Sequence, residues 1–198
     1  MPIRELTVHA FTDQLAARTP VPGGGAVAAV TAAHAAALGA MVVEFTLGKP
    51  KFAAHESANA AALARLGELR THALALADRD AAAYAQLNAL WKLPKDAPER
   101  AAGWDAAVAE AIEAPQAILD AACEVAVRCQ GLAAATNPNL ASDLAIALDL
   151  ARVACRAAAH NVDVNLPSVT DADRRQALAD RMQVALARAG AAAGAAHA

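Results

Sequence analysis

Aromatic residues are scarce in this sequence: one tyrosine, two tryptophans and three phenylalanines make up 3% of its 198 residues. Strands favour aromatic and β-branched side chains, so this scarcity argues against a β-sandwich or a β-barrel. An excess of charge is missing too, because 17 Lys and Arg residues face 20 Asp and Glu residues. With 57% hydrophobic residues and a net charge of −3, the chain does not have the composition of a disordered protein.

Further absences exclude whole classes of function. Basic residues never run beyond the pair Arg174–Arg175, so we do not expect nucleic-acid binding, which depends on neutralising phosphates. The three cysteines show no CxxC spacing, and no HExxH or ExxH pair occurs. We therefore predict no metal site and expect reduced cysteines in a cytoplasmic protein. No signal peptide is expected, because the first twenty residues contain no continuous apolar run.

Alanine fills the chain instead, at 62 of 198 positions. It is the best helix former, which predicts an all-α fold. Because alanine buries little area, such helices must approach each other closely or gain stability from a partner subunit. We predict a single domain over residues 1–198, built as an alanine-rich bundle of about six to seven helices that forms a homodimer.

Apolar periodicity and helix breakers place the helices. Pro115 is predicted to kink the fourth helix or to start a fifth that reaches Gln130 or Ala135. Ser142 or Asp143 is predicted to cap the next helix. Thr170 or Asp171 is predicted to cap the last helix, and residues 190–198 are predicted to form a frayed tail. The predicted helices run over about 7–18, 25–47, 53–91, 99–113, 115–135, 142–164 and 171–190.

One segment has the length of a membrane span. Residues 26–43 carry no formal charge over 18 positions. Nine of these residues are alanine, His34 stands in the middle, and Glu44 follows at once. We predict a packed interior helix and no association with a membrane, with His34 as a core histidine.

Three glycines, Gly23, Gly24 and Gly25, open the second predicted helix after the rigid segment 20–22. Their backbone N–H groups can converge, and the helix N-terminus adds the positive end of its dipole. This combination is typical of a site for an anionic or strongly polar ligand group. It is not a P-loop, because no Gly-Lys-Ser/Thr follows and no strand precedes it. The alternative is a tight turn that needs positive φ.

A carboxylate stands on an otherwise apolar stripe of the third predicted helix. Asp80 falls in step with Leu76 and Tyr84, whereas Asp78 points roughly the opposite way. A carboxylate in such surroundings is costly unless it is paired or used. Asp80 is therefore a general base, or it is paired with Arg79 or another helix. Tyr84, one turn on, would border the same pocket.

Other polar residues recur near helix ends. Asn161 and Asn165 lie one turn apart, and two buried amides there must find hydrogen-bond partners, which favours a ligand or interface role. Ser142 and Asp143 follow a turn and are either a cap or part of a site. Lys49 follows the second predicted helix and either meets an anionic ligand tail or is a solvated lysine.

With these residues in place, the sequence resembles the family of methenyltetrahydrofolate cyclohydrolases and formiminotetrahydrofolate cyclodeaminases. The resemblance spans nearly the whole chain. It rests on an ordered series of segments: TPVPGGGAVAAV at 19–30, MVVEFTLGKPKF at 41–52, ADRDAAAYAQL at 77–87, LPK at 93–95, NPNLASD at 137–143 and NVDVNL at 161–166.

The resemblance implies an all-helical fold that dimerises and folate one-carbon chemistry at the carbon bridging N5 and N10. The reaction we expect is reversible hydrolysis of 5,10-methenyltetrahydrofolate to 10-formyltetrahydrofolate, with no cofactor beyond the tetrahydrofolate-type substrate. A cyclodeaminase that releases ammonia from 5-formiminotetrahydrofolate is the alternative, and a non-catalytic folate-binding module is a third. A chain of 198 residues without a formiminotransferase domain favours the stand-alone cyclohydrolase.

The resemblance also implies roles for individual residues. Asp80 matches the general base, which also stabilises the cationic substrate. Three positions depart from the family pattern, since Ala26, Arg79 and Thr136 stand where a serine, an acid and a glycine are usual. The residues that match the folate-binding positions are Gly23, Gly24, Gly25, Lys49, Ser142, Asp143, Asn161 and Asn165.

Overall fold

The computed structural model describes residues 1–194, and within them the chain is all-helical, without a strand. This confirms the predicted all-α bundle and its number of helices. The six α-helices are α1 (Val8–Ala16), α2 (Gly24–Glu44), α3 (Glu56–Trp91), α4 (Pro98–Gly131), α5 (Ala141–Asn165) and α6 (Ala172–Gly194).

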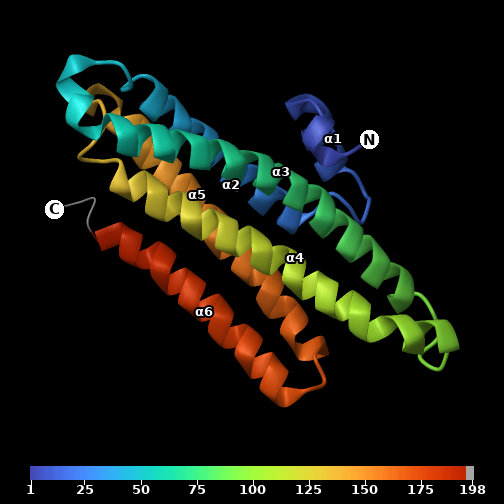
Figure 1. The fold of residues 1–198 in the computed structure, drawn as a ribbon. Coiled ribbons are helices and arrows are strands. Elements are labelled where there is room, and N and C mark those ends of the chain that lie inside the picture. Colours follow the sequence, from blue (N-terminus) through green and yellow to red (C-terminus); the bar gives the residue numbers. More distant parts are fainter. Residues whose placement is uncertain (195–198) are drawn as a thin grey trace.

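Four long helices form the centre of the fold. Helix α2 packs against α3 and α5, and α4 packs against the same two helices from the other side. Helices α3, α4 and α6 lie in front of α2 and α5 in Figure 1, and α6 lies against α4 and α5. Helices α2 and α5 run antiparallel: Gly24 at the start of α2 adjoins Asn161, and Thr46 just after α2 binds the N–H of Asn137 just before α5.

Small residues allow the helices to approach closely, as the alanine content predicts. Along α2 the buried positions are largely alanines. At Gly39 even a methyl group would be too large, because a Cβ there would lie 2.9 Å from the Sγ of Cys129 and 3.5 Å from Leu66. The contact of α2 with α3 and α4 therefore depends on a missing side chain.

Helix α4 excludes one of the two alternatives predicted for Pro115, the start of a fifth helix. Pro115 neither starts a new helix nor ends one, and it is buried inside an uninterrupted helix of 34 residues. A proline there lacks the N–H that would bind the carbonyl of Ala111. The side chain of Asn165 supplies the missing donor, with its Nδ2 3.0 Å from that carbonyl oxygen. The helix therefore continues because another helix satisfies the freed carbonyl.

Predicted helix ends differ in detail. Ser142 and Asp143 do not cap α5, because a 3-10 turn at Pro138–Leu140 leads directly into it and Leu140 takes the cap position. The carboxylate of Asp171 does accept a bond from the N–H of Arg174, which confirms that cap. The predicted frayed tail, 190–198, is helical as far as Gly194, and its last residues, 195–198, lie outside the described residues.

The apolar helix α2 is packed, as predicted, although its length and composition would allow it to cross a membrane. The prediction that His34 is a core histidine is wrong, because His34 lies on the side of α2 that is exposed. Its most apolar window has a mean hydropathy of 1.9, and 56% of that window is buried. The covering helices are α3, α4 and α5.

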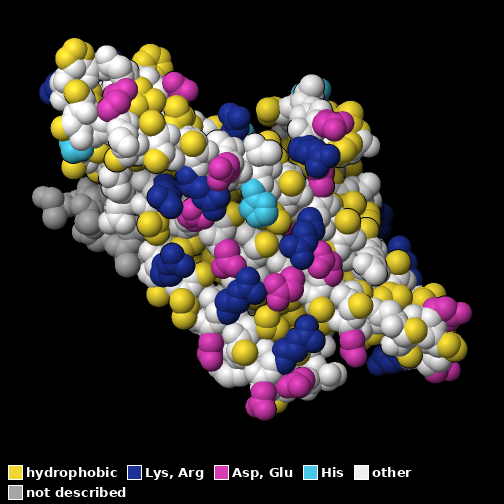
Figure 2. Space-filling model, in the orientation of Figure 1, with side chains coloured by type: hydrophobic (Ala, Val, Ile, Leu, Met, Phe, Trp, Pro, Cys, Tyr) yellow, Lys and Arg dark blue, Asp and Glu magenta, His cyan; other side chains and the backbone are white. Residues whose placement is uncertain are grey.

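The opposite side of the bundle is charged. Figure 2 shows Lys and Arg side chains interspersed with Asp and Glu across the face formed by α3, α4 and α6. Ion pairs join these helices, with N–O distances of 2.7 Å for Arg65–Glu124, 2.6 Å for Arg79–Glu110 and 2.7 Å for Arg181–Asp120. This face has the character of a solvated surface.

We predict that Gly39→Ala lowers the free energy of unfolding by about 1–3 kcal/mol, the usual cost of overpacking a core. The matched control is Gly67→Ala in α3, where an added Cβ would meet nothing within 4 Å. There alanine should be neutral or stabilising by up to about 1 kcal/mol. Urea unfolding followed by circular dichroism measures both, and equal effects would contradict the close approach at Gly39.

Candidate functional site

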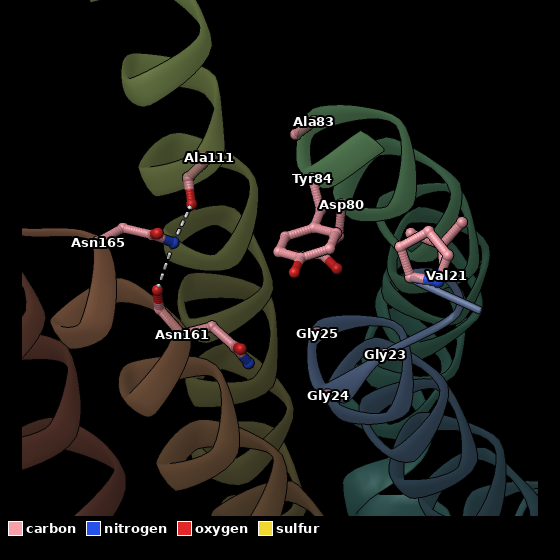
Figure 3. Close-up of a pocket in the computed structure, with 11 residues that line it drawn as sticks. Val21, Gly23, Gly24, Gly25, Asp80, Ala83, Tyr84, Ala111, Asn161 and Asn165 are labelled. Carbon is pink, nitrogen blue, oxygen red and sulfur yellow. Dashed lines mark hydrogen bonds between the residues drawn. The ribbon is translucent and has the colours of Figure 1, made fainter. Parts of the chain in front are cut away.

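A pocket of about 270 Å³ lies where α2 begins, between the ends of α2 and α5 and the side of the α3–α4 pair. Figure 3 shows Asp80 and Tyr84 projecting into it from α3, with Asn161 and Asn165 on the opposite wall. The structure thus brings together most of the residues that the sequence singles out. The lining residues are Pro20, Val21, Gly23, Gly24, Gly25, Asp80, Ala83, Tyr84, Ala111, Asn161 and Asn165.

The glycines are needed for space rather than for an unusual backbone. None of the three has positive φ, and Gly23 precedes α2 in an extended conformation. The tight-turn alternative is therefore wrong. A Cβ on Gly25 would overlap both carboxylate oxygens of Asp80. No side chain caps α2, so its first N–H groups are open to the pocket and can bind an anionic or polar group.

Asp80 lies in this pocket without the partner that sequence reasoning left open. Arg79 forms its ion pair with Glu110, and Asp78 binds the N–H of Ile3 and the guanidinium of Arg4. No hydrogen bond or ion pair of the Asp80 carboxylate occurs within residues 1–190. Burial raises the pKa of Asp80 from 3.8 to about 6, which leaves the carboxyl able to gain or lose a proton near neutral pH.

The two asparagines have fixed amide nitrogens and free amide oxygens. Asn161 donates from Nδ2 to the carbonyl of Ala157 at 3.0 Å. Asn165 donates to the carbonyls of Ala111 and Asn161, at 3.0 and 2.9 Å (Figure 3). Within residues 1–190 nothing donates to either side-chain oxygen, so both can accept hydrogen bonds from a ligand. The bond from Asn165 to the carbonyl of Ala111 is possible because Pro115 has no N–H to bind that carbonyl. Sequence reasoning missed this role of Pro115.

An aromatic row leads away from the pocket along the α3–α4 pair. The ring of Tyr84 lies 6.3 Å from that of Trp91, which lies 6.5 Å from that of Trp104, each pair edge to face. Arg100 stacks over Trp104 at 4.6 Å. Half of the chain's six aromatic residues therefore form one row that begins at the pocket. Helical spacing predicts the first two members of the row, but nothing in the sequence places Trp104 with them.

Three of the predicted site residues are not brought to this pocket within one chain. Lys49 follows Gly48, whose φ of +71° ends the turn after α2, at the far end of the bundle. Ser142 and Asp143 lie in the first turn of α5, whereas Asn161 lies near its last. At 1.5 Å per residue, Asp143 and Asn161 are about 27 Å apart along the helix axis.

The departures from the family pattern lie outside the pocket lining. Arg79 is engaged with Glu110 and Ala26 is fully buried in the core. Thr136 lies at the far end of the bundle, where its hydroxyl binds the carbonyl of Leu132. Within residues 1–194, no group of His, Cys, Asp and Glu side chains is placed to hold a metal ion.

Comparisons with known proteins agree over most of the chain. A model of the family described as Formiminotransferase-cyclodeaminase matches residues 7–184. The methenyltetrahydrofolate cyclohydrolase of Methylorubrum extorquens is 32% identical over 189 residues, which are 93% of this chain and 91% of that protein. The formimidoyltransferase-cyclodeaminase of Sus scrofa is 31% identical over 190 residues, 92% of this chain but 35% of that protein. The chain thus spans about a third of the length of that bifunctional relative.

The fold is also similar to a solved structure. The crystal structure of formiminotetrahydrofolate cyclodeaminase from Thermotoga maritima superposes with a TM-score of 0.90 at 28% sequence identity. The match covers 98% of this chain and 95% of that one.

The raised pKa of Asp80 predicts that this residue costs stability at neutral pH. The stability that the neutral carboxyl contributes is fully present below pH 3.8 and is lost as the pH rises through about 6. At 1.36 kcal/mol per pKa unit, the cost above pH 6 is at most about 3 kcal/mol. Asp80→Asn should therefore raise the free energy of unfolding by about 1–3 kcal/mol at pH 7.5, and the gain should vanish as the pH falls toward 3.8. Urea unfolding across this range measures it; a loss of stability at pH 7.5 would contradict it.

Proposed function

The chain belongs to the formiminotransferase-cyclodeaminase family, as its motifs predict, and on this premise we propose that it hydrolyses 5,10-methenyltetrahydrofolate to 10-formyltetrahydrofolate in a reversible reaction. The carrying observation is the carboxylate of Asp80, which is half-buried and unpaired within residues 1–190 and faces the open N-terminus of α2. The relative that matches along nearly its full length bears the name of this activity.

Asp80 fits the proton transfers that this hydrolysis needs. The bridging carbon of the substrate shares a positive charge with N5 and N10, and an ionised carboxylate beside it stabilises that charge. Water attacks the carbon while Asp80 takes its proton, which gives a tetrahedral intermediate. The bond from carbon to N5 then breaks as Asp80 returns the proton to N5. The remaining hydroxyl proton of the intermediate leaves to solvent as the formyl C=O forms, so that one proton is released per turnover. A pKa of about 6 suits both directions of transfer near neutral pH.

The other walls of the pocket fit the remaining polar groups of the substrate. The open N–H groups at the start of α2 can bind the oxygen that becomes the formyl group, where negative charge develops. The side-chain oxygens of Asn161 and Asn165 can accept hydrogen bonds from N–H groups of the pterin ring. Gly25 keeps the helix end close to Asp80, so that both act on the same carbon.

The aromatic row offers a surface for the part of the substrate that extends out of the pocket. Tyr84 lines the pocket, and Trp91 continues the row along the same side of α3. The aminobenzoyl ring of the substrate can pack against these rings while the pterin occupies the pocket.

A cyclodeaminase is the second candidate, because the similar solved structure bears that name. Loss of ammonia from a tetrahedral carbon needs a proton donor, and a carboxyl with a pKa of about 6 can supply it. The same pocket therefore serves either reaction, and the substrate offered in the assay separates them.

We expect the purified protein to accelerate the loss of methenyl absorbance beyond the spontaneous rate. Asp80→Asn should lower the turnover about 10²–10⁴-fold, the usual contribution of a general base. The matched control is Asp78→Asn, two residues away on the same helix and outside the pocket, which should keep most of the activity. Ammonia release from 5-formiminotetrahydrofolate without methenyl hydrolysis would favour the deaminase, and tight folate binding with neither reaction would favour a binding module.

The pH dependence of the hydrolysis should follow the ionisation of Asp80. Because the base must be ionised, the rate should fall below an apparent pKa of about 6. The residual rate of Asp80→Asn should lack this step. A profile that keeps the step in the variant would assign the ionisation to another group.

Intrinsic fluorescence should report on the aromatic row, because Trp91 and Trp104 are the two tryptophans of the chain. A folate with its aminobenzoyl arm should quench the emission, whereas a pterin without the arm should not. Trp91→Ala should weaken folate binding about 3–10-fold, as expected for loss of one aromatic contact, and should leave pterin binding unchanged. Trp104→Phe is the control that keeps Trp91; equal effects on both ligands would contradict this path.

A further inference from the structure

Pro115 is buried in α4 one turn after Ala111, a residue that lines the pocket, although Pro115 itself does not line it. In a regular α-helix the carbonyl of residue 111 accepts the N–H of residue 115, and proline has none. The proline ring also crowds that carbonyl, which favours turning it away from the helix axis. The carbonyl of Ala111 is therefore available to a donor outside α4.

Asn165 is that donor, and two hydrogen bonds fix the orientation of its amide. Its Nδ2 lies 3.0 Å from the carbonyl oxygen of Ala111 and 2.9 Å from that of Asn161 (Figure 3). A primary amide has two N–H donors, so both are used. Turning the amide over would place its oxygen against two carbonyl oxygens. The side-chain oxygen of Asn165 is thus held in place and remains an acceptor without a donor within residues 1–190.

Asn161, one turn earlier on α5, contributes a second acceptor to the same wall of the pocket. Its Nδ2 donates to the carbonyl of Ala157 at 3.0 Å, and its side chain lies against Gly24 at the start of α2. Residues one helical turn apart have their side chains roughly 5 Å apart. The wall therefore presents two neighbouring amide oxygens to a ligand.

The place of this wall determines which edge of a pterin it meets. Figure 3 shows the two asparagines on the side of the pocket opposite Asp80. In the proposed reaction the carbon beside Asp80 is bonded to N5, and N8 lies diagonally across the same ring from N5. A substrate in this pose turns N8 toward the asparagines. On that edge of a tetrahydropterin, N8–H and the 2-amino group flank N1, at a separation similar to that of side chains one helical turn apart.

We propose that Pro115 is a positioning residue for the recognition of reduced pterins and that it acts by fixing Asn165. The oxygens of Asn161 and Asn165 accept hydrogen bonds from N8–H and the 2-amino group, one each. In a fully oxidised pterin N8 carries a lone pair in place of its hydrogen, and that lone pair would face an amide oxygen. The inference rests on the proposed function, which supplies the folate and its pose.

A positioning role predicts opposite effects of Pro115→Ala on folding and on recognition. The alanine N–H can bind the carbonyl of Ala111 within α4, so the urea midpoint should rise or stay unchanged. Asn165 then loses one of the two bonds that hold its amide, so its contribution to selectivity should fall. A proline that merely filled the core would instead lower the urea midpoint when it is truncated.

Calorimetric titration of the full chain tests the recognition of the pterin edge without turnover. Tetrahydrofolate and its 5-deaza analogue, which keeps N8–H, should bind alike. The 8-deaza analogue, with CH₂ in place of N8–H, and the 2-desamino analogue should each bind about 10–100-fold more weakly, because each leaves one buried acceptor without a donor. An 8-deaza or a 2-desamino analogue that binds as tightly as the 5-deaza analogue would contradict this recognition.

Variants then test whether Pro115 acts through Asn165. Asn161→Ala and Asn165→Ala should each lose the selectivity against one of the two weak analogues, a different one for each variant. Pro115→Ala should lose about 3–10-fold of the selectivity against the same analogue as Asn165→Ala and keep the other. Pro98→Ala is the matched control, since Pro98 is the first residue of α4, where no N–H is needed. Equal weakening of all ligands by Pro115→Ala, or unchanged selectivity, would overturn the proposal.

A double variant separates recognition from folding. Asn165→Ala alone leaves the carbonyl of Ala111 without its donor and should lower the urea midpoint. Pro115→Ala/Asn165→Ala restores a donor within α4, so the midpoint should recover while the selectivity stays that of Asn165→Ala. A midpoint that does not recover would show that Asn165 does not compensate for Pro115.

Failure of this inference is distinguishable from failure of the proposed function. A chain that binds the ligands with the expected selectivity but turns over neither folate substrate would refute the proposed function and leave the role of Pro115 standing. A chain that hydrolyses 5,10-methenyltetrahydrofolate but binds the 8-deaza and 5-deaza analogues equally would refute this inference alone.

Discussion

The structure depends on the close contact between the carboxylate of Asp80 and the backbone of Gly25, which has no side chain. Asp80 lies so close to Gly25 that any Cβ there would overlap its oxygens. That approach brings α3 to the start of α2 and removes part of the water around the carboxyl, which raises its pKa to about 6. It also leaves the first N–H groups of α2 beside the same space. A half-buried charge without a fixed partner is costly, so the bundle gives up stability at Asp80, whose carboxyl can gain or lose a proton near neutral pH.

A hydrogen bond between two helices supports the opposite wall of the pocket. Pro115 removes one hydrogen bond from α4, and Asn165 satisfies the carbonyl of Ala111 that is left without a donor. The same amide nitrogen also binds the carbonyl of Asn161, which fixes the side-chain oxygen of Asn165 toward the pocket. A defect in one helix thus orients a polar group on another. Pro115 acts on the site through Asn165 without touching the pocket.

Much of this could be predicted from the sequence, because local patterns encode local structure. The apolar stripe of α3 makes Asp80 conspicuous, and the glycines and paired asparagines identify the other walls. The failures have physical causes. Proline normally ends a helix, and only the long-range bond from Asn165 explains why Pro115 does not. The family motifs group Asp143 with Asn161, although a continuous helix over both residues already places them about 27 Å apart, too far to share one pocket within one chain. Trp104 joins the aromatic row through tertiary packing alone.

Alanine limits the apolar area that this bundle buries. Helices that pack through methyl groups approach closely but bury little apolar area per residue. Larger apolar side chains are few, and several of them, among them Phe45, Ile146 and Val153, are exposed. Stability therefore depends on how closely the helices approach. At Gly39 and at Gly25 an added Cβ would meet atoms of a neighbouring helix, so these two positions fix the distance between α2 and its neighbours. The same close packing that compensates for small side chains also sets the position of Asp80 beside the start of α2.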